Sequence, residues 1–444
     1  MPTGSNFLIE FGGKKILIDC GLVQGEEYSL PINSEPFSYD PKSIDFLFVT
    51  HGHLDHVGRI PRLVRDGFRG KIISTEPTRE IAELIMLDSM GLLGKEALRS
   101  NVPPLYEERD VFESIHLWDT VLTYEQVYTV PTDKGEATIT LHDAGHILGS
   151  AVVEISYNGK KIAFTGDLGN TPSPLMRDTT NLKDIDYLVM ESVYGDRNHK
   201  DKDKRIEIFK EAVTSTIKKG GTVLIPAFSI ERTQEMLLAF NELVEGNQIP
   251  PVPVYLDSPL GINITTIYKK YESWFNENIK SIEKSGDDIF AFKGLIKTKT
   301  PEESKAINND NGPKVIIAGS GMSNGGRIVH HEAKYLPDEN STLIVVGYQS
   351  VGTLGRKIIE GAKEVLIHGS PVAMRARLVN IHGFSAHKDS DHLVEFVSST
   401  APSLKKICVV LGEPKSSYYL GQRLYEEYGV PITVPEKGDK IEFA

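Results

Sequence analysis

Short apolar runs alternate with amphipathic segments along most of the chain. Residues 44–49, which read Ile-Asp-Phe-Leu-Phe-Val, have the length and composition of a buried strand. Residues 152–164 carry apolar positions on both sides of Asn158-Gly159, a dipeptide typical of the tight turn in a β-hairpin. These patterns predict that the first part of the chain builds sheets.

The pattern becomes more regular after about residue 200. An amphipathic helix is predicted over 204–219, where Phe209 and Val213 fall on one apolar stripe and Gly220-Gly221 ends the helix. Further strands are predicted at 222–226, 253–256, 314–318 and 342–346, and helices at 236–244, 262–271 and 328–335. Alternation of this kind predicts a mainly parallel sheet flanked by helices. We therefore expect an inserted α/β domain here.

Composition narrows the class of protein. The chain has 444 residues, of which 40% are hydrophobic and 25% charged, as in ordinary globular proteins. No apolar run of about 18 residues and no signal-like start are visible, so we expect a cytoplasmic protein with no membrane partner. The only cysteines, Cys20 and Cys408, exclude a disulfide framework and a cysteine-rich zinc site. The formal charge of -12 argues against broad charge-driven binding of nucleic acid, although bound cations would add positive charge locally.

The predicted strand at 44–49 leads directly into a cluster of metal-ligand residue types. Residues 50–56 read Thr-His-Gly-His-Leu-Asp-His. Side chains two apart share a face of an extended backbone, so His51 and His53 can hold one cation while Asp55 and His56 turn toward another. This spacing predicts half of a two-metal site.

Two later segments complete the predicted site. His146 lies among small residues, as expected where backbone passes close to an ion, and it is our third ligand for the first metal. Asp167 follows the predicted hairpin and can bridge both ions. Cations about 3.5–4 Å apart can share a hydroxide and clamp the oxygens of an in-line displacement.

Taken together, these motifs resemble the metallo-β-lactamase fold hydrolases, specifically the β-CASP branch of nucleases, which includes RNA-processing exonucleases and cleavage-factor-like proteins. The resemblance covers nearly the whole chain. It implies an αββα sandwich with an inserted parallel α/β domain, that is, a metallo-β-lactamase domain at 1–195 and 353–444 and a β-CASP domain at 196–352. It also implies a short strand before residues 3–10, where this sequence has only Met1-Pro2.

The resemblance also assigns further site residues. Asp19 corresponds to a carboxylate that orients the histidine loop without binding metal itself. Glu191 matches a strand-end acid of the branch and His387 its next histidine, which would protonate the departing oxygen. Leu411 stands where the branch has a histidine that completes the second metal site. We therefore expect Zn²⁺ at two sites, with weaker binding at the second, and Mn²⁺ as an alternative metal. His382 is a conceivable substitute ligand, but we expect it to be structural.

A glycine-rich loop at 320–327 is the most distinctive part of the insert. Backbone amides at such a loop before a helix bind anions, so Ser320, Ser323 and Arg327 are candidate phosphate contacts. Arg232 and Arg356 match other segments that the branch places along the substrate. The alternative is that these arginines cap helices or pair with acids.

These observations predict a metal-dependent phosphodiesterase that cuts single-stranded RNA with a metal-bound hydroxide in a cleft between two domains. Asp55, Glu191 and His387 are the expected catalytic residues, and a homodimer is a further expectation. The same motifs serve RNA and DNA cleavage, and endonucleases as well as exonucleases. Two alternatives stay open: a catalytically weak RNA-binding subunit, and a serine hydrolase that uses Ser323 in Gly321-Met-Ser-Asn-Gly325.

Overall fold

The chain folds into two compact units. The computed structural model describes residues 3–24, 30–200 and 202–443. The first unit comprises residues 1–198 and 386–444, and the second unit comprises residues 199–385. The second unit extends to residue 385 because β18 (Arg377–Asn380) pairs with β15 (Thr342–Val345) in its sheet. The expected domain boundaries, with the insert at 196–352, stay a prediction.

The first unit contains two sheets. The five-stranded sheet has the order β1 (Phe7–Phe11), β2 (Lys14–Ile18), β3 (Phe46–Phe48), β4 (Lys71–Thr75) and β5 (Thr120–Leu122). The seven-stranded sheet has the order β20 (Ile432–Thr433), β19 (Lys406–Val410), β10 (Tyr187–Glu191), β9 (Lys160–Phe164), β8 (Ala151–Tyr157), β7 (Gly135–Asp143) and β6 (Val127–Thr132). The hairpin predicted around Asn158-Gly159 is confirmed as β8 and β9.

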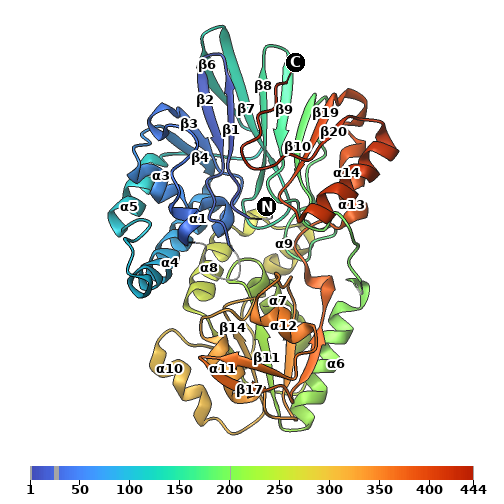
Figure 1. The fold of residues 1–444 in the computed structure, drawn as a ribbon. Helices are drawn as coiled ribbons and strands as arrows, with labels where there is room; N and C mark the ends of the chain where they lie inside the picture. The colour runs from blue at the N-terminus through green and yellow to red at the C-terminus, as the bar shows by residue number, and fades with distance from the viewer. Residues whose placement is uncertain (1–2, 25–29, 201, 444) are drawn as a thin grey trace. The chain divides into compact units, whose positions relative to one another are not determined.

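The two sheets lie face to face (Figure 1) because each presents an apolar surface to the other. Ile16, Phe48 and Ile73 from the five-stranded sheet belong to the same buried cluster as Leu141 and Val153 from the seven-stranded sheet. Helices α3 (Ile60–Arg65), α4 (Glu76–Ser100) and α5 (Glu108–Leu117) lie on the outer side of the five-stranded sheet (Figure 1). The shorter elements α1 (Leu30–Ser34), η1 (Pro41–Ser43) and α2 (Leu54–Val57) lie in the connections between its strands.

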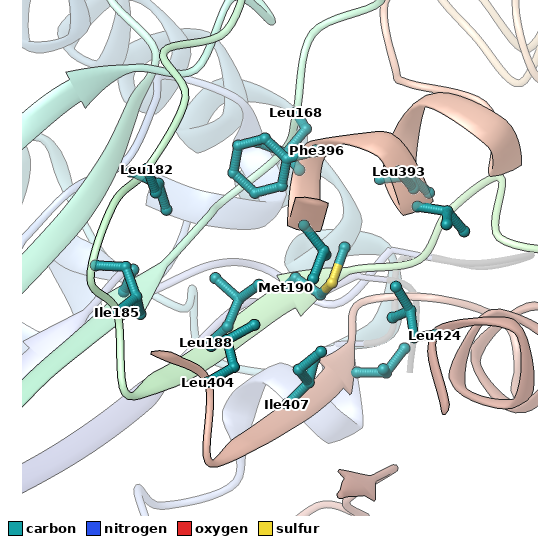
Figure 2. Packing of buried hydrophobic residues seen from close by; sticks show 14 of the residues in the cluster. Leu168, Leu182, Ile185, Leu188, Met190, Leu393, Phe396, Leu404, Ile407 and Leu424 are labelled. Atoms are coloured by element: carbon teal, nitrogen blue, oxygen red, sulfur yellow. The ribbon is translucent and has the colours of Figure 1, made fainter. Parts of the chain in front are cut away.

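The outer face of the seven-stranded sheet packs against α13 (Ser390–Ser398) and α14 (Pro414–Tyr428). Successive residues of a strand point to opposite faces, so Leu188 and Met190 of β10 face these helices. Figure 2 shows them among Leu393, Phe396 and Leu424. The 3₁₀ turn η6 (Ala401–Ser403) connects α13 to β19. The first unit is therefore the αββα sandwich that the resemblance implied.

The second unit is built on a six-stranded sheet in which every neighbouring pair is parallel. Its order is β13 (Leu295–Lys297), β12 (Val254–Asp257), β14 (Lys314–Ala318), β11 (Thr222–Pro226), β15 and β18. Its helices are α6 (Arg205–Lys218), α7 (Arg232–Glu245), α8 (Pro259–Lys270), α9 (Glu277–Lys284), α10 (Pro301–Ala306), α11 (Ile328–Tyr335) and α12 (Leu354–Ile359). Shorter elements are the hairpin β16 (Glu364–Ile367) and β17 (Ser370–Ala373) and the 3₁₀ turns η2 (Lys202–Lys204), η3 (Glu272–Trp274), η4 (Ile307–Asn309) and η5 (His382–Phe384). The predicted parallel, helix-flanked sheet is confirmed.

Two further expectations concern a strand near the N-terminus and the lack of a membrane-spanning segment. The resemblance implied a short strand before residues 3–10, and Met1-Pro2, which precede them here, lie outside the described residues. None of the helices in the described part of the chain has both the length and the apolar character that a membrane crossing requires. The cytoplasmic location stays a prediction.

We expect the α13 and α14 side of the first unit to be sensitive to truncation of Leu188. This side chain is fully buried. Leu188→Ala removes buried methyl groups and leaves a cavity, so the free energy of unfolding should fall by about 2–5 kcal/mol in chemical denaturation. Leu98→Ala is the matched control, because Leu98 is 83% exposed and its change should stay within about 0.5 kcal/mol. Equal effects of the two substitutions would contradict this account of the core.

Candidate metal centre

The acids and histidines of the predicted site follow the ends of neighbouring strands in the first unit. Asp19 follows β2 and the histidine loop follows β3, and these strands are parallel neighbours. Asp167 follows β9 and Glu191 ends β10, which also pair in parallel. Because parallel neighbours end at the same edge of a sheet, residues far apart in sequence meet there.

Four side chains converge closely enough to share one cation. One ligand atom from each of His51, His53, His146 and Asp167 lies within 4.8 Å of all the others. His53 Nδ1 is 3.0 Å from His51 Nε2 and 3.3 Å from His146 Nε2. Asp167 Oδ2 is 3.4 Å from His51 Nε2 and 3.5 Å from His146 Nε2. We call these four residues the first donor group.

The spacing within the first donor group fits a divalent cation. Ligand atoms about 2.1 Å from a tetrahedral ion are about 3.4 Å from one another, close to the four spacings observed here. Imidazole nitrogens and a carboxylate are also the ligand types that zinc and related metals accept. The group can therefore hold a metal ion on its chemistry and on its geometry.

Asp167 connects this group to a second one. His56 Nε2 lies 3.5 Å from Asp167 Oδ1 and 4.0 Å from Asp55 Oδ2. We call Asp55, His56 and Asp167 the second donor group. The two oxygens of Asp167 thus face different histidines, as a carboxylate that bridges two ions would require.

The loop that carries His146 is held by backbone contacts. His146 Nδ1 lies 3.3 Å from the carbonyl oxygen of Ala386, and its backbone N–H donates to Ser150 Oγ at 3.0 Å. If Nδ1 donates to this carbonyl, Nε2 keeps its lone pair for a metal. Gly169 allows the close approach of this loop, because a Cβ there would lie 1.8 Å from the carbonyl oxygen of Gly145.

Asp19 is buried behind the second donor group. Its Oδ2 lies 2.7 Å from His56 Nδ1 and accepts a hydrogen bond from Ser5 Oγ at 3.0 Å. Its Oδ1 accepts from the backbone N–H of Thr50 at 2.8 Å. The predicted orienting carboxylate therefore contacts the histidine loop directly. Sequence reasoning missed Ser5 and Thr50, because isolated hydroxyl residues carry no metal-site signal.

Glu191 and His387 form a pair next to the donor groups. Glu191 is fully buried, and its Oε1 lies 3.2 Å from His387 Nδ1. The backbone N–H groups of Leu168 and Val193 donate to the same carboxylate. Burial acts to lower the pKa of His387, but the carboxylates of Glu191, Asp167 and Asp55 together outweigh it and raise the pKa to about 9. The ring centroids of His387 and His146 are 4.6 Å apart.

The pKa shifts of His53 and His146 in the first donor group and of His56 in the second have opposite directions. Burial holds the pKa of His53 and that of His146 well below the ordinary value, and neighbouring histidines add to this effect. Burial also acts to lower the pKa of His56, but the carboxylates of Asp167, Asp19 and Asp55 raise it well above the ordinary value. His53 and His146 therefore favour the neutral imidazole, the form that binds metal, whereas His56 lies among carboxylates.

Leu411 lies directly after β19. Its φ is 54° and its side chain is 9% exposed. The register of β19 against β10 places Val410 beside Glu191, so Leu411 lies at the same strand end as that acid. A leucine has no lone pair, so this position adds no ligand to the second donor group.

The five candidate phosphate contacts all belong to the second unit, and most of them are engaged there. Arg327 donates to Asp257 Oδ1 at 2.7 Å and to the carbonyl oxygens of Thr298 and Lys299. Arg232 pairs with Glu235 and Arg356 with Glu360. Ser320 Oγ accepts from the backbone N–H of Asn324. Each of the three arginines thus pairs with an acid, as in the alternative to a phosphate contact given above.

Ser323 is buried in the glycine-rich loop, and its hydroxyl donates to Glu332 Oε1 at 2.5 Å. A serine nucleophile needs a neighbouring histidine as base. The hydrogen bond of Ser323 instead goes to an acid, which argues against the serine hydrolase.

Comparison with known proteins covers most of the chain. A family model described as "Metallo-beta-lactamase superfamily" matches residues 3–214. A model described as "Beta-Casp domain" matches residues 233–358. A third, described as "Zn-dependent metallo-hydrolase RNA specificity domain", matches residues 371–435.

Individual relatives align over nearly the full chain. "Ribonuclease TTHA0252" of Thermus thermophilus is 35% identical over 95% of this chain and 93% of its own length. "RNase J-like protein" of Methanocaldococcus jannaschii is 33% identical over 96% and 93%. "Transcription termination factor FttA" of Methanosarcina mazei is 32% identical over 95% of this chain and 67% of its own length. A solved structure of a protein of unknown function from Enterococcus faecalis V583 has a TM-score of 0.55 at 13% identity and covers 99% of this chain and 97% of that one, which shows the fold alone.

Replacing Leu411 by histidine should strengthen the second donor group. Histidine tolerates a left-handed backbone better than most residues, so Leu411→His should leave the fold intact. Metal content per purified chain, measured by elemental analysis after dialysis against Zn²⁺ or Mn²⁺, should rise toward two. Leu411→Phe is the matched control, because it adds a ring without a ligand nitrogen. An unchanged metal content in Leu411→His would show that this position does not mark a deficient site.

Proposed function

The chain belongs to the metallo-β-lactamase superfamily, in the branch that carries a Beta-Casp domain, and from this premise we propose that it is a metal-dependent phosphodiesterase that cleaves RNA. The observation that carries the proposal is the position of Asp167 between two groups of metal-type donors, with the Glu191–His387 pair beside them. A match to an RNA specificity domain and relatives named as ribonucleases support RNA as the substrate.

We propose that the two donor groups hold two divalent cations. His51, His53 and His146 would hold the first, Asp55 and His56 the second, and Asp167 would bridge them. Zn²⁺ is the first expectation for this donor set, and Mn²⁺ is the alternative. When bound, such ions lower the pKa of a coordinated water and offset the charge of a phosphate.

His387 is the proposed proton donor. Its Nδ1 faces Glu191, so the proton that can leave is the one on Nε2. The adjacent Glu191 carboxylate raises the pKa of this imidazole and so favours its protonated form. The cationic ring can therefore transfer this proton to the departing oxygen, after which the buried Glu191 carboxylate still holds the neutral ring in place.

The substrate contacts of the second unit are proposed at the glycine-rich loop. Because Asp257 already holds the guanidinium of Arg327, we assign this arginine to shaping the loop. The hydroxyl of Ser320 accepts from the backbone N–H of Asn324 but keeps its own proton to donate, so we assign it to a phosphate contact. Ser323, Arg232 and Arg356 would support these contacts through their own acid partners. We propose single-stranded RNA as the substrate, and the homodimer stays a prediction.

A catalytically weak RNA-binding subunit is the second candidate, and Leu411 favours it because the second donor group lacks a ligand at this position. The two candidates differ in a direct assay. An enzyme cleaves a labelled single-stranded RNA when metal is supplied, whereas a silent subunit retains RNA in a filter-binding assay and leaves it intact.

Asp167→Ala should abolish RNA cleavage. The substitution removes the bridging carboxylate, so both donor groups lose a ligand and bound metal should fall in elemental analysis. Cleavage of labelled RNA by the purified full chain is the main measurement. Asp119→Ala, at an exposed acid of the same unit, is the control and should keep full activity. Retained cleavage in Asp167→Ala would defeat the two-ion proposal.

His387→Ala should slow turnover by about 10²–10⁴-fold, the usual contribution of a general acid. Metal content should stay at the wild-type level, because this histidine is assigned to proton transfer. Single-turnover cleavage and elemental analysis on the same preparation check both parts. His116→Ala, an exposed histidine on α5, is the control. Loss of metal together with activity would instead make His387 a ligand.

A further inference from the structure

Thr50 lies where the segments of the metal centre meet. It is 1% exposed. Its backbone N–H donates to Asp19 Oδ1, and its carbonyl oxygen accepts from Ala151 at 2.8 Å, just after the loop that carries His146. Its side chain packs against Gly166, where an added Cβ would lie 2.7 Å from Thr50 Cβ. One residue thus contacts the segments of Asp19, His146 and Asp167 and is itself bonded to His51.

The hydroxyl of Thr50 has two close polar neighbours: a carboxylate oxygen, which accepts hydrogen bonds, and an imidazole nitrogen, which can donate or accept. Oγ1 lies 2.9 Å from Asp19 Oδ2 and 3.0 Å from His51 Nδ1, with His56 Nδ1 farther away at 3.4 Å. An ionised carboxylate only accepts hydrogen bonds, so the single hydroxyl proton goes to Asp19. The oxygen is then an acceptor, and its partner at His51 Nδ1 must carry a proton.

This arrangement fixes which nitrogen of His51 is free. A neutral imidazole with its proton on Nδ1 has its lone pair on Nε2, and Nε2 is the atom that faces His53 and Asp167. His56 reaches the same state through its direct contact with Asp19. One buried carboxylate can therefore orient a histidine of each donor group.

We propose that Thr50 is a positioning residue whose hydroxyl relays Asp19 to His51 and thereby keeps Nε2 of that histidine available to the first cation. The inference rests on the proposed function, in which His51 and His56 are ligands. Loss of the hydroxyl leaves a buried N–H of His51 without its acceptor, and the ring can then shift its proton to Nε2 or rotate. Either change weakens the binding of a cation by His51, although the histidine itself is still present.

Variants of Thr50 test the relay through metal affinity. Thr50→Val keeps the shape and removes the hydroxyl, and Thr50→Ser keeps the hydroxyl and removes the methyl group. The full chain, stripped of metal, is titrated with Zn²⁺ and with Mn²⁺ against a competing chelator. Thr50→Val should bind the first ion about 10–100-fold more weakly, as is usual when a group that supports a ligand is lost. Thr50→Ser should stay within about threefold of wild type.

A matched control at Thr400 distinguishes an effect on metal binding from a general loss of fold stability. Thr400 in the same unit is also 1% exposed, and its hydroxyl accepts from the backbone N–H of Ile185 at 3.0 Å. Thr400→Val should lower the Tm of the metal-free chain, as Thr50→Val does, but leave metal affinity unchanged. A purely structural role for Thr50 predicts the same pattern for both valine variants.

The possible results distinguish a failure of the proposed function from a failure of the relay through Thr50. A wild-type chain that takes up neither metal overturns the proposed function itself. Wild-type binding with an unchanged Thr50→Val, or with a Thr50→Ser as weak as Thr50→Val, overturns the relay and leaves the proposed function in place. If Thr50→Val does not fold, Thr50→Ala fits the same space with a smaller side chain and takes its place in the comparison.

Discussion

Several imidazoles and carboxylates must lie close together at strand ends of both sheets, largely buried, and the first unit is arranged around this requirement. His51 is fully buried, and His146 and Asp167 are 2% and 6% exposed. Buried ionisable groups are costly unless opposite charges or metal ions compensate them. The parallel strand ends bring the groups together, and close backbone approaches such as that at Gly169 keep them there. Divalent cations would supply the missing positive charge.

The parts of the fold that local sequence determines could be predicted. The strands at 222–226 and 314–318 and the helix at 328–335 occur with the bounds expected from their apolar patterns. The helix predicted from 262 begins earlier, at Pro259, because Ser258 caps it and proline is favoured in a first turn. The metal-type donors could also be found, because their residue types and short spacing carry a chemical signal before any folding is considered.

Partners that come from distant segments could not be predicted in this way. Thr50, Ser5 and the carbonyl oxygen of Ala386 matter because packing places them beside a histidine or an acid, and nothing local distinguishes them. Arg327 gives the opposite case. Its place in a glycine-rich loop indicates an anion contact, yet the structure engages it with Asp257 at the end of β12. His331, one helical turn later, bonds to the other oxygen of the same acid, so this loop is fixed from within the second unit.

The expected lack of a histidine ligand at Leu411 would affect more than the number of ligands in the proposed second site. The second donor group has two carboxylates for one histidine, and these acids together with Asp19 raise the pKa of His56 against the effect of burial. The same surplus of negative charge attracts a divalent ion even with fewer protein ligands. Catalytic metal sites keep a coordination position free for water or substrate, whereas structural sites close it. We expect a second ion that lacks a histidine ligand to be held less tightly and to be more open to a substrate oxygen. Leu411 would then lower the affinity for this ion and increase its accessibility.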